Sequence, residues 1–320
     1  MTCFRGQRSG LRFSTLFLFL LVAWRPAVAG DKDGILNTLS LKLSGGLGLT
    51  GIGDLRDHVG ALDDYLHSFC NEYNYLPGQL DRPGIWGPDV ALEVRLELGR
   101  GLSLGIGTGF MKTADHSASY GIGDFSGGAP VLDPRSITTD LRSDIRSIPV
   151  QADISRSWPL SRNLSLTAGA GVAVYFSSVK LERRMGIHPV FYVVEELVIR
   201  PHLDDLFSLS GFGIGPLGKV GLEYKISRPL TLVLEVEGRY AGITHLKGLQ
   251  DYSYYSPLNA EYFVHGEIEG TLQIGTSDKT VMGLTNDFPD LSVTPSETMR
   301  TARLDLSGFS CRLGFRLRLF

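Results

Sequence analysis

The sequence predicts an all-β fold. Apolar and polar residues alternate with a period of two over much of the chain, and this pattern places successive side chains on opposite faces of a strand. The composition agrees, because 39 of the 320 residues are glycines and long helical periods are few. Beyond the N-terminal segment, no stretch holds 18 consecutive apolar residues, so we expect no membrane-spanning helix.

The N-terminal segment, residues 1–29, is predicted to be a cleaved export signal. Three arginines precede an apolar run from Phe13 to Trp24, and an Ala-Val-Ala cleavage site ends at Ala29. The run is too short for a membrane anchor. Without the four arginines of the signal, the chain has 27 basic and 34 acidic residues, which argues against a nucleic-acid partner. Residues 30–320 are then expected to form one β domain.

The cysteines and histidines predict no metal site. Cys3 leaves with the signal, and Cys70 and Cys311 have neither a disulfide framework nor metal-ligand neighbours. The seven histidines fall in or beside predicted loops, where solvation is the expected state. No cofactor and no catalytic residue is predicted.

Eight strands account for the alternating segments. They are 39–50, 89–98, 102–110, 148–154, 164–176, 212–226, 230–240 and 302–320. The last shows the pattern most clearly, with Phe309, Leu313 and Phe315 on one face and Arg312 and Arg316 on the other. Taken alone, this strand fits either a soluble sandwich or a membrane barrel with its apolar face toward lipid.

The connections between these strands favour the barrel. Long segments (51–88, 112–143, 181–206 and 245–301) alternate with short turns (99–101, 159–163 and 227–229). Membrane barrels have long outer loops and short periplasmic turns. We therefore predict an antiparallel up-and-down transmembrane β-barrel of eight strands with four long outer loops and three short periplasmic turns. Segments 190–199 and 267–274 are also strand-like, so they either extend hairpins above the membrane or make ten strands. Residues 61–70 could form a short helix.

If the apolar faces meet lipid, the lumen is charged. The predicted lumen charge network is Lys42, Glu93, Arg95, Glu97, Asp153, Lys219, Glu223, Lys225, Glu235, Glu237, Arg239, Arg312, Arg316 and Arg318. Buried charges need partners, and an eight-stranded barrel is only just wide enough for its own side chains. We therefore expect a lumen closed by ion pairs, with inward glycines such as Gly105 and Gly171 making room.

In its signal, strand count, loop alternation and terminal aromatic residue, the chain resembles small bacterial outer-membrane β-barrels, the class that includes the OmpA transmembrane domain, OmpX and OmpW. The resemblance implies a location in the Gram-negative outer membrane, with outer-membrane lipid and lipopolysaccharide as surroundings. It also implies that Phe320 is the signal read by the barrel-assembly machinery. Phe320 departs from the usual pattern, because it shares its face with Arg316 and Arg318.

The predicted function is a structural or loop-mediated surface-binding role, without enzymatic activity. The candidate loop contact residues are Tyr73, Tyr75, Trp86, Tyr252, Tyr254 and Tyr255. The sequence does not specify their ligand. Two alternatives remain open: a narrow porin-like channel for small or apolar solutes, and an outer-membrane lipid-modifying enzyme.

Overall fold

The computed structural model describes residues 38–72, 75–76, 80, 85–123, 133–190, 202–256, 262–275, 282–285 and 299–319. The predicted signal peptide, the predicted assembly signal Phe320 and the candidate contact residue Tyr73 lie outside these ranges. Within them, every long element except one helix is a strand. The all-β prediction is therefore confirmed for the described part of the chain, with a single helical exception.

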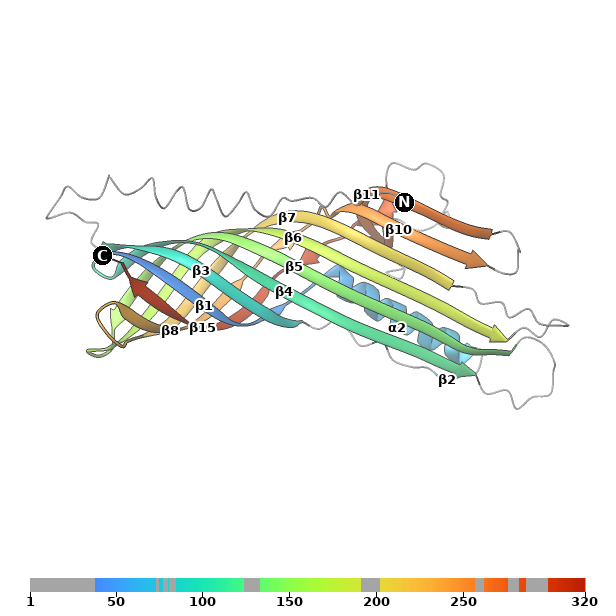
Figure 1. Cartoon of the computed structure of the whole chain (residues 1–320), viewed down its shortest axis with the longest axis horizontal. Helices are drawn as coiled ribbons and strands as arrows, with labels where there is room; N and C mark the ends of the chain where they lie inside the picture. The colour runs from blue at the N-terminus through green and yellow to red at the C-terminus, as the bar shows by residue number, and fades with distance from the viewer. Residues whose placement is uncertain are drawn as a thin grey trace, which may run out of the picture.

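Eight strands form a closed ring (Figure 1). In order around it they are β1 (Thr38–Thr50), β3 (Trp86–Gly99), β4 (Leu102–Gly123), β5 (Asp133–Pro159), β6 (Leu164–Val190), β7 (His202–Lys225), β8 (Leu230–Arg239) and β15 (Gly308–Arg318). All pairings are antiparallel, and β15 closes the ring by pairing with both β8 and β1. The antiparallel barrel predicted from the alternation is confirmed.

The three short connections gather at one end of the ring, where the C-terminus also lies (Figure 1). They join β3 to β4, β5 to β6 and β7 to β8. Gly99, Arg100 and Gly101 all have positive φ in the first of them, a conformation that glycine adopts without strain. β1 begins at this same end, since Ser40 pairs with Arg318.

The ring strands are longer than the sequence predicted. β4 runs on to Gly123 and β5 begins at Asp133, so most of the predicted long loop 112–143 is strand. β6 likewise continues to Val190, and β7 already starts at His202. The prediction of loops here was wrong because the alternation changes phase along these strands, as described below.

Two further strands widen the wall without entering the ring. β10 (Lys247–Ser256) pairs with the first part of β7, from His202 to Ser210, and β11 (Tyr262–Gly275) pairs with β10. The second part of β7 pairs with β8 instead. The shorter strands are β2 (Tyr75–Leu76), β9 (Gly242–Ile243), β12 (Met282–Thr285), β13 (Met299–Thr301) and β14 (Leu304–Asp305).

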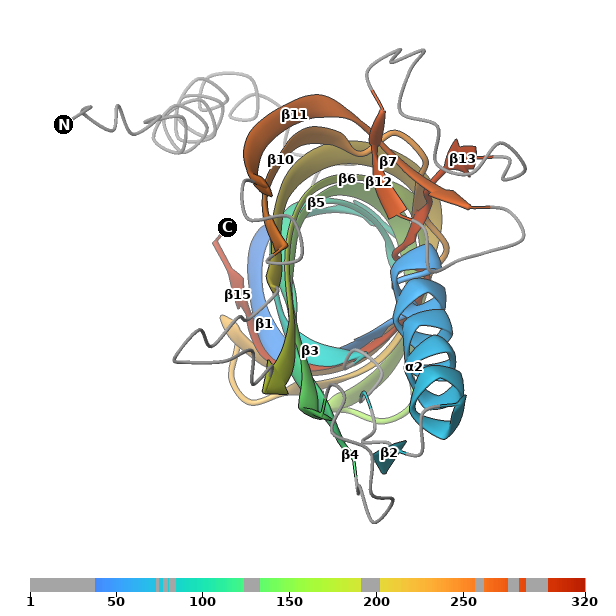
Figure 2. The same ribbon diagram turned by 90° about the vertical axis from the view of Figure 1, so that its right-hand side faces the viewer.

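The helix α2 (Asp54–Glu72) follows β1 and is longer than the predicted 61–70. Leu55, Val59, Leu62 and Leu66 repeat at helical spacing and are buried, which gives α2 one apolar face. Figure 2, viewed along the barrel, shows α2 lying along the side where the curved wall would otherwise be open. No helix in the described ranges has the length and hydropathy needed to cross a membrane.

Candidate functional site

The outer face of the ring is a continuous apolar belt. Its side chains are all more than a third exposed and include Leu43, Leu47, Val90, Ile106, Phe110, Ile148, Ile154, Val172, Phe176, Phe212, Ile214, Val220, Leu222, Leu234, Val236, Phe309, Leu313 and Phe315. They occupy alternate positions on their strands, so the residues between them face the interior. Exposed apolar surface of this extent is not typical of a monomer that folds in water.

The interior behind this belt is filled with charge. The six bases are Lys42, Arg95, Lys219, Arg239, Arg312 and Arg316, and the six acids are Asp89, Glu93, Asp153, Glu223, Glu235 and Glu237. All are buried except the half-buried Arg316. We call these twelve residues the charge network. Because acids and bases are equal in number, the network carries no net charge when all twelve are ionised.

Glu93 lies at the centre of the network and is fully buried. Its Oε2 is 2.8 Å from Lys42 Nζ and 3.0 Å from Lys219 Nζ, and its Oε1 is 2.7 Å from Arg95 Nη2. Lys219 also lies 2.7 Å from Asp153 Oδ2. A carboxylate so far from water is stable as an ion only when it has several such partners.

Arg312 extends the network to the first half of β15. Its guanidinium contacts Asp89 Oδ1 and Glu235 Oε1, each at 3.3 Å, and donates a hydrogen bond to Glu237. Arg239 meets the other oxygen of Asp89, also at 3.3 Å. Sequence reasoning left Asp89 out, although it shares strand and parity with Glu93, and that parity was the signal that could have found it.

The other predicted network residues lie toward the short connections. Arg316 donates to Glu223 at 2.6 Å. Glu97 and Arg318 pair with each other at 3.0 Å, partly exposed at the rim. Lys225 is exposed at the end of β7, and no described residue forms an ion pair with it. Placing it inside the network was wrong, because it is the last residue of β7 and is exposed at the rim beside the short connection.

Glycine makes room for these long side chains. A Cβ at Gly105 would lie 2.9 Å from both Asp153 Oδ2 and Glu93 Oε1. A Cβ at Gly171 would lie 2.7 Å from the Cβ of Asp153. Small residues at these inward positions therefore allow the carboxylates to meet Lys219.

The polarity of the wall inverts at one register row. Lys112 of β4 pairs with Arg146 of β5, Arg146 pairs with Ser178 of β6, and Ser178 pairs with Ser210 of β7. We call these four residues the boundary row. The near half is the part of the wall between this row and the short connections, and the far half is the part of the wall beyond the row. In the near half, the apolar side chains point outward. In the far half they point inward.

The inversion is clearest on β5 and β6. The far-half residues Leu141, Ile145, Val179 and Leu181 are buried inside, and the outward positions there are Asp140, Arg142, Asp144, Arg146, Ser178, Lys180, Glu182 and Arg184. The far-half interior is thus mostly apolar, and the apolar face of α2 packs into it. A buried charged exception is Asp205, which pairs with Arg183 and accepts a hydrogen bond from Gln250. His58 of α2 is fully buried here, so its predicted position in a solvated loop was wrong.

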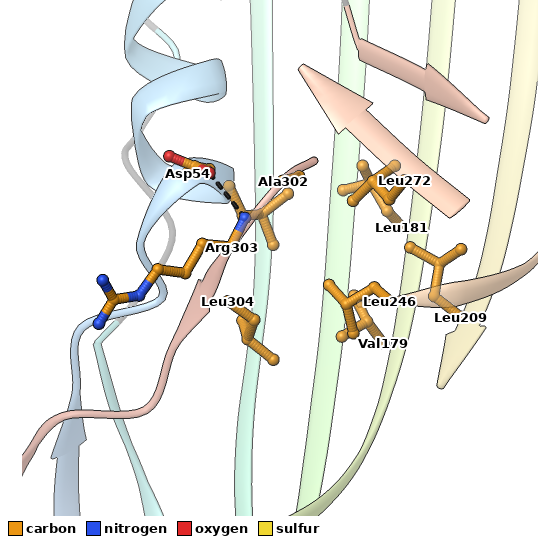
Figure 3. Close-up of a pocket in the computed structure, with 10 residues that line it drawn as sticks. Asp54, Val179, Leu181, Leu209, Leu246, Leu272, Ala302, Arg303 and Leu304 are labelled. Atoms are coloured by element: carbon orange, nitrogen blue, oxygen red, sulfur yellow. Dashed lines mark hydrogen bonds between the residues drawn. The ribbon is translucent and has the colours of Figure 1, made fainter. Parts of the chain in front are cut away.

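A small apolar pocket lies between α2 and the far-half wall (Figure 3). It is lined by Leu55, Val179, Leu181, Leu209, Leu246, Leu272, Ala302 and Leu304, with Asp54 and Arg303 at its edge. This pocket was not predicted from the sequence. Its lining residues come from segments far apart in the chain, among them the predicted loop 51–88, the strand-like segment 267–274 and the predicted strand 302–320.

The first turn of α2 is tied to the segment before β15. Both oxygens of Asp54 accept hydrogen bonds of 2.7 Å from the guanidinium of Arg300, and Oδ2 also accepts one of 2.6 Å from the backbone N–H of Arg303. A carboxylate in the first helical turn is favourable because it faces the positive end of the helix dipole. Ile52, just before the helix, is buried with φ of 57°, a strained conformation for a β-branched residue.

The candidate loop contact residues lie mostly on strands. Trp86 starts β3 and is 61% exposed on the outer face. Tyr75 belongs to β2, and Tyr252, Tyr254 and Tyr255 belong to β10. The loop assignment was wrong for these five residues, since the wall continues through them.

Comparisons with known proteins give only weak similarities. No family model and no curated protein matches it. A major outer membrane protein from Thermus thermophilus aligns at 12% identity and a TM-score of 0.32, covering 88% of this chain and 100% of that one. The outer membrane protein OprG from Pseudomonas aeruginosa aligns at 10% identity and a TM-score of 0.34, covering 90% of this chain and 99% of that one. Similarity at this level assigns no family and no activity.

Proposed function

We propose that this chain is an outer-membrane β-barrel protein with a closed lumen and a structural or surface-binding role that involves no catalysis. The observation that carries the proposal is the inversion of wall polarity at the boundary row. Outward apolar side chains form a belt in the near half, where the interior is charged and sealed, whereas in the far half Leu206 and Leu249 are isolated exposed apolar residues. A belt that ends abruptly along one row fits a change of solvent from lipid to water.

The length of the belt supports a membrane location. The outward apolar positions extend over nine residues of β4, from Leu102 to Phe110, and over seven of β5, from Ile148 to Ile154, after which the outward Arg156 lies over the ring of Trp158. A tilted transmembrane strand needs about 9–11 residues. Trp158 at the short-connection end and Tyr240 near the opposite edge are both exposed, as interfacial aromatic residues are.

The charge network supports a closed lumen. Lys42 is 1% exposed and Glu93 is fully buried, so neither side chain lines an aqueous path. Opening such a path would separate ion pairs of 2.7–3.0 Å. A single barrel of eight strands is filled by its own side chains.

Planar-bilayer conductance of the detergent-folded protein tests the closed lumen. We expect the native protein to insert without steady unitary currents. The double variant Glu235→Ala with Arg316→Ala should leak, because it removes two members of the network. The matched control, Glu97→Ala with Arg318→Ala, removes the same two charge types at the exposed rim and should remain silent. Steady currents in the native protein would overturn the closed lumen, and solubility without detergent would overturn the membrane location.

A second candidate, a path for small apolar solutes, would start from the apolar pocket of the far half, which would have to widen to admit a solute. Such a path would pass between α2 and the wall rather than through the charge network. Xenon is a suitable apolar probe, since dry apolar cavities bind it. A xenon NMR shift in the native protein that disappears in Leu272→Trp, but persists in the outward variant Leu234→Trp, would support this candidate.

A further inference from the structure

Three cations stand immediately beyond the apolar belt on three neighbouring strands. Lys112 and Arg146 belong to the boundary row, and Lys180 lies two residues beyond it on β6. All three occupy outward-facing positions, and Arg146 and Lys180 are exposed. We call them the basic triad. A single carboxylate, Asp144, lies among them.

The register brings these side chains within reach of one small ligand. Lys112 is directly opposite Arg146, and Asp144 is directly opposite Lys180. Directly opposite residues have Cβ atoms about 4.5–5.5 Å apart and diagonal ones about 7–8 Å. Arg146 is thus opposite one lysine and diagonal to the other. Three long, flexible cations can converge above such a patch.

Asp144 cannot neutralise all three cations. It lies 2.6 Å from Arg146 Nη2 and 3.7 Å from Lys112 Nζ. Among the described residues, Lys180 has no ion pair. The patch therefore keeps a net charge of about two positive units, given that lysine and arginine are fully protonated at neutral pH.

The arginines next to the basic triad on the outer face are, unlike the triad, each matched by a carboxylate. Farther from the belt, Arg142 pairs with Asp140, and Arg184 pairs with Glu182, so each arginine there has its own carboxylate. On the adjoining strand β7, the outward positions nearest the belt are the uncharged Ser208 and Ser210. One strand further on, the exposed Lys247 of β10 lies opposite Ser210, so it is separated from the basic triad by the uncharged positions of β7. Within the described wall, a cluster of three cations on neighbouring strands at the belt edge occurs on β4–β6.

We infer that the basic triad binds the phosphate of an anionic lipid headgroup whose acyl chains lie against the belt below it. This inference rests on the proposed membrane location. Arginine and lysine are the side chains that bind phosphate in proteins, arginine with a planar fork and lysine as a point charge. Phe110, Ile148 and Phe176 lie two residues to the belt side of Lys112, Arg146 and Ser178, so they offer apolar contact directly next to the cations.

The site is tested by native mass spectrometry of the detergent-folded protein titrated with diphosphorylated lipid A. We expect Lys180→Gln to weaken binding about fivefold, and Lys112→Gln, Arg146→Gln and Lys180→Gln together about a hundredfold, since each cation near an anionic surface contributes about 1 kcal/mol. The matched control changes Arg100, Arg162 and Arg228 to Gln at the opposite end of the barrel. It alters the net charge equally and should bind as the native protein does.

Two further binding measurements test whether the lipid phosphate is the group that binds. Lipid A without its phosphates should bind the native protein at least tenfold more weakly, and millimolar inorganic phosphate should not displace the phosphorylated lipid. Equal binding of the phosphate-free lipid, unchanged binding by the triple variant, or full displacement by inorganic phosphate would each overturn the site. Co-flotation of the native protein with phosphatidylcholine vesicles is measured first. Failure there overturns the proposed membrane location, whereas insertion followed by indifference to phosphate overturns only the lipid site.

Discussion

The near half of the barrel interior is filled by twelve charged side chains, whereas the far half is filled mainly by apolar residues and the helix α2, with an ion pair between Arg183 and Asp205. The outer faces show the reverse order, apolar beside the charges and charged beside the apolar core. A wall in lipid must be apolar outside, so its polar positions can only face inward. A wall in water buries its apolar side chains instead. On the proposed membrane location, the same antiparallel sheet has two interiors because its surroundings change from lipid to water along its length.

The largest expected effect comes from breaking the near-half interior. Lys42→Met removes the shared partner of Glu93 and Glu235 and should lower the free energy of unfolding by about 3–5 kcal/mol, since it leaves buried carboxylates uncompensated. Urea unfolding in lipid vesicles measures this loss. Lys225→Met, which removes an exposed lysine, should change stability by no more than about 0.5 kcal/mol. Equal effects of the two variants would show that the network does not stabilise the barrel.

A core truncation tests the far-half interior separately. Leu62→Ala on the buried face of α2 should cost about 2 kcal/mol or more through lost packing. Hydrogen exchange should show faster exchange in α2, while protection of the ring strands around Glu93 stays unchanged. Loss of protection in both halves together would mean that the two interiors unfold as one unit.

Glycine substitution tests how tightly the charges are packed. Gly105→Ala places a methyl group 2.9 Å from two network carboxylate oxygens and should destabilise the barrel by about 1–3 kcal/mol. Gly45→Ala is the matched control, because the nearest atom to its new Cβ is a Val90 methyl carbon at 3.9 Å. Urea unfolding of both variants compares them, and a larger loss for Gly45→Ala would contradict the packing argument.

The contact between α2 and β13 should weaken when its ion pair is lost. Arg300→Gln removes the two-pronged contact with Asp54 at the start of α2. We expect a loss of about 1 kcal/mol in helix docking, because Arg300 is substantially exposed. Faster protease cleavage near α2 would show this weaker docking of the helix. Unchanged cleavage would assign the docking of α2 to its apolar face alone.

The smallest expected effect is a pH dependence of the outer charged face. The hydrogen bond from Arg146 holds the pKa of Asp144 below its usual value of 3.8. A lowered pKa adds stability that is present above about pH 4 and is lost as pH falls through the folded-state pKa. The native protein should therefore lose a few tenths of a kcal/mol more than Asp144→Asn between about pH 5 and pH 3, an amount kept small by solvent screening. Parallel pH profiles in urea unfolding would contradict this.

The alternation of residue types along the chain determined much of the barrel by itself. Parity alone separated the outward Leu313 and Phe315 from the inward Arg312. The alternating connection lengths placed the start of the first strand and the end of the last strand at the same end of the barrel. A period of two leaves a residue only two faces, so a strand's pattern fixes which side chains share the same surroundings. The sequence prediction failed where that pattern changed phase, as on β5 between Arg146 and Ile148, because a fixed phase makes the part of the strand beyond the change, here the part before Arg146, look like a loop.

Tertiary structure alone decided which charges meet and how the far half closes. Glu93 and Lys219 are 126 residues apart, and only the register of the closed ring brings them within 3.0 Å. The position of α2 along the open side of the wall depends equally on long-range contacts, since Asp54 is held by Arg300, 246 residues away. The sequence by itself specified the faces of the strands, because alternation is local. The ion pairs, the apolar pocket and the basic triad depend on the order and register of the strands, which single-strand patterns do not encode.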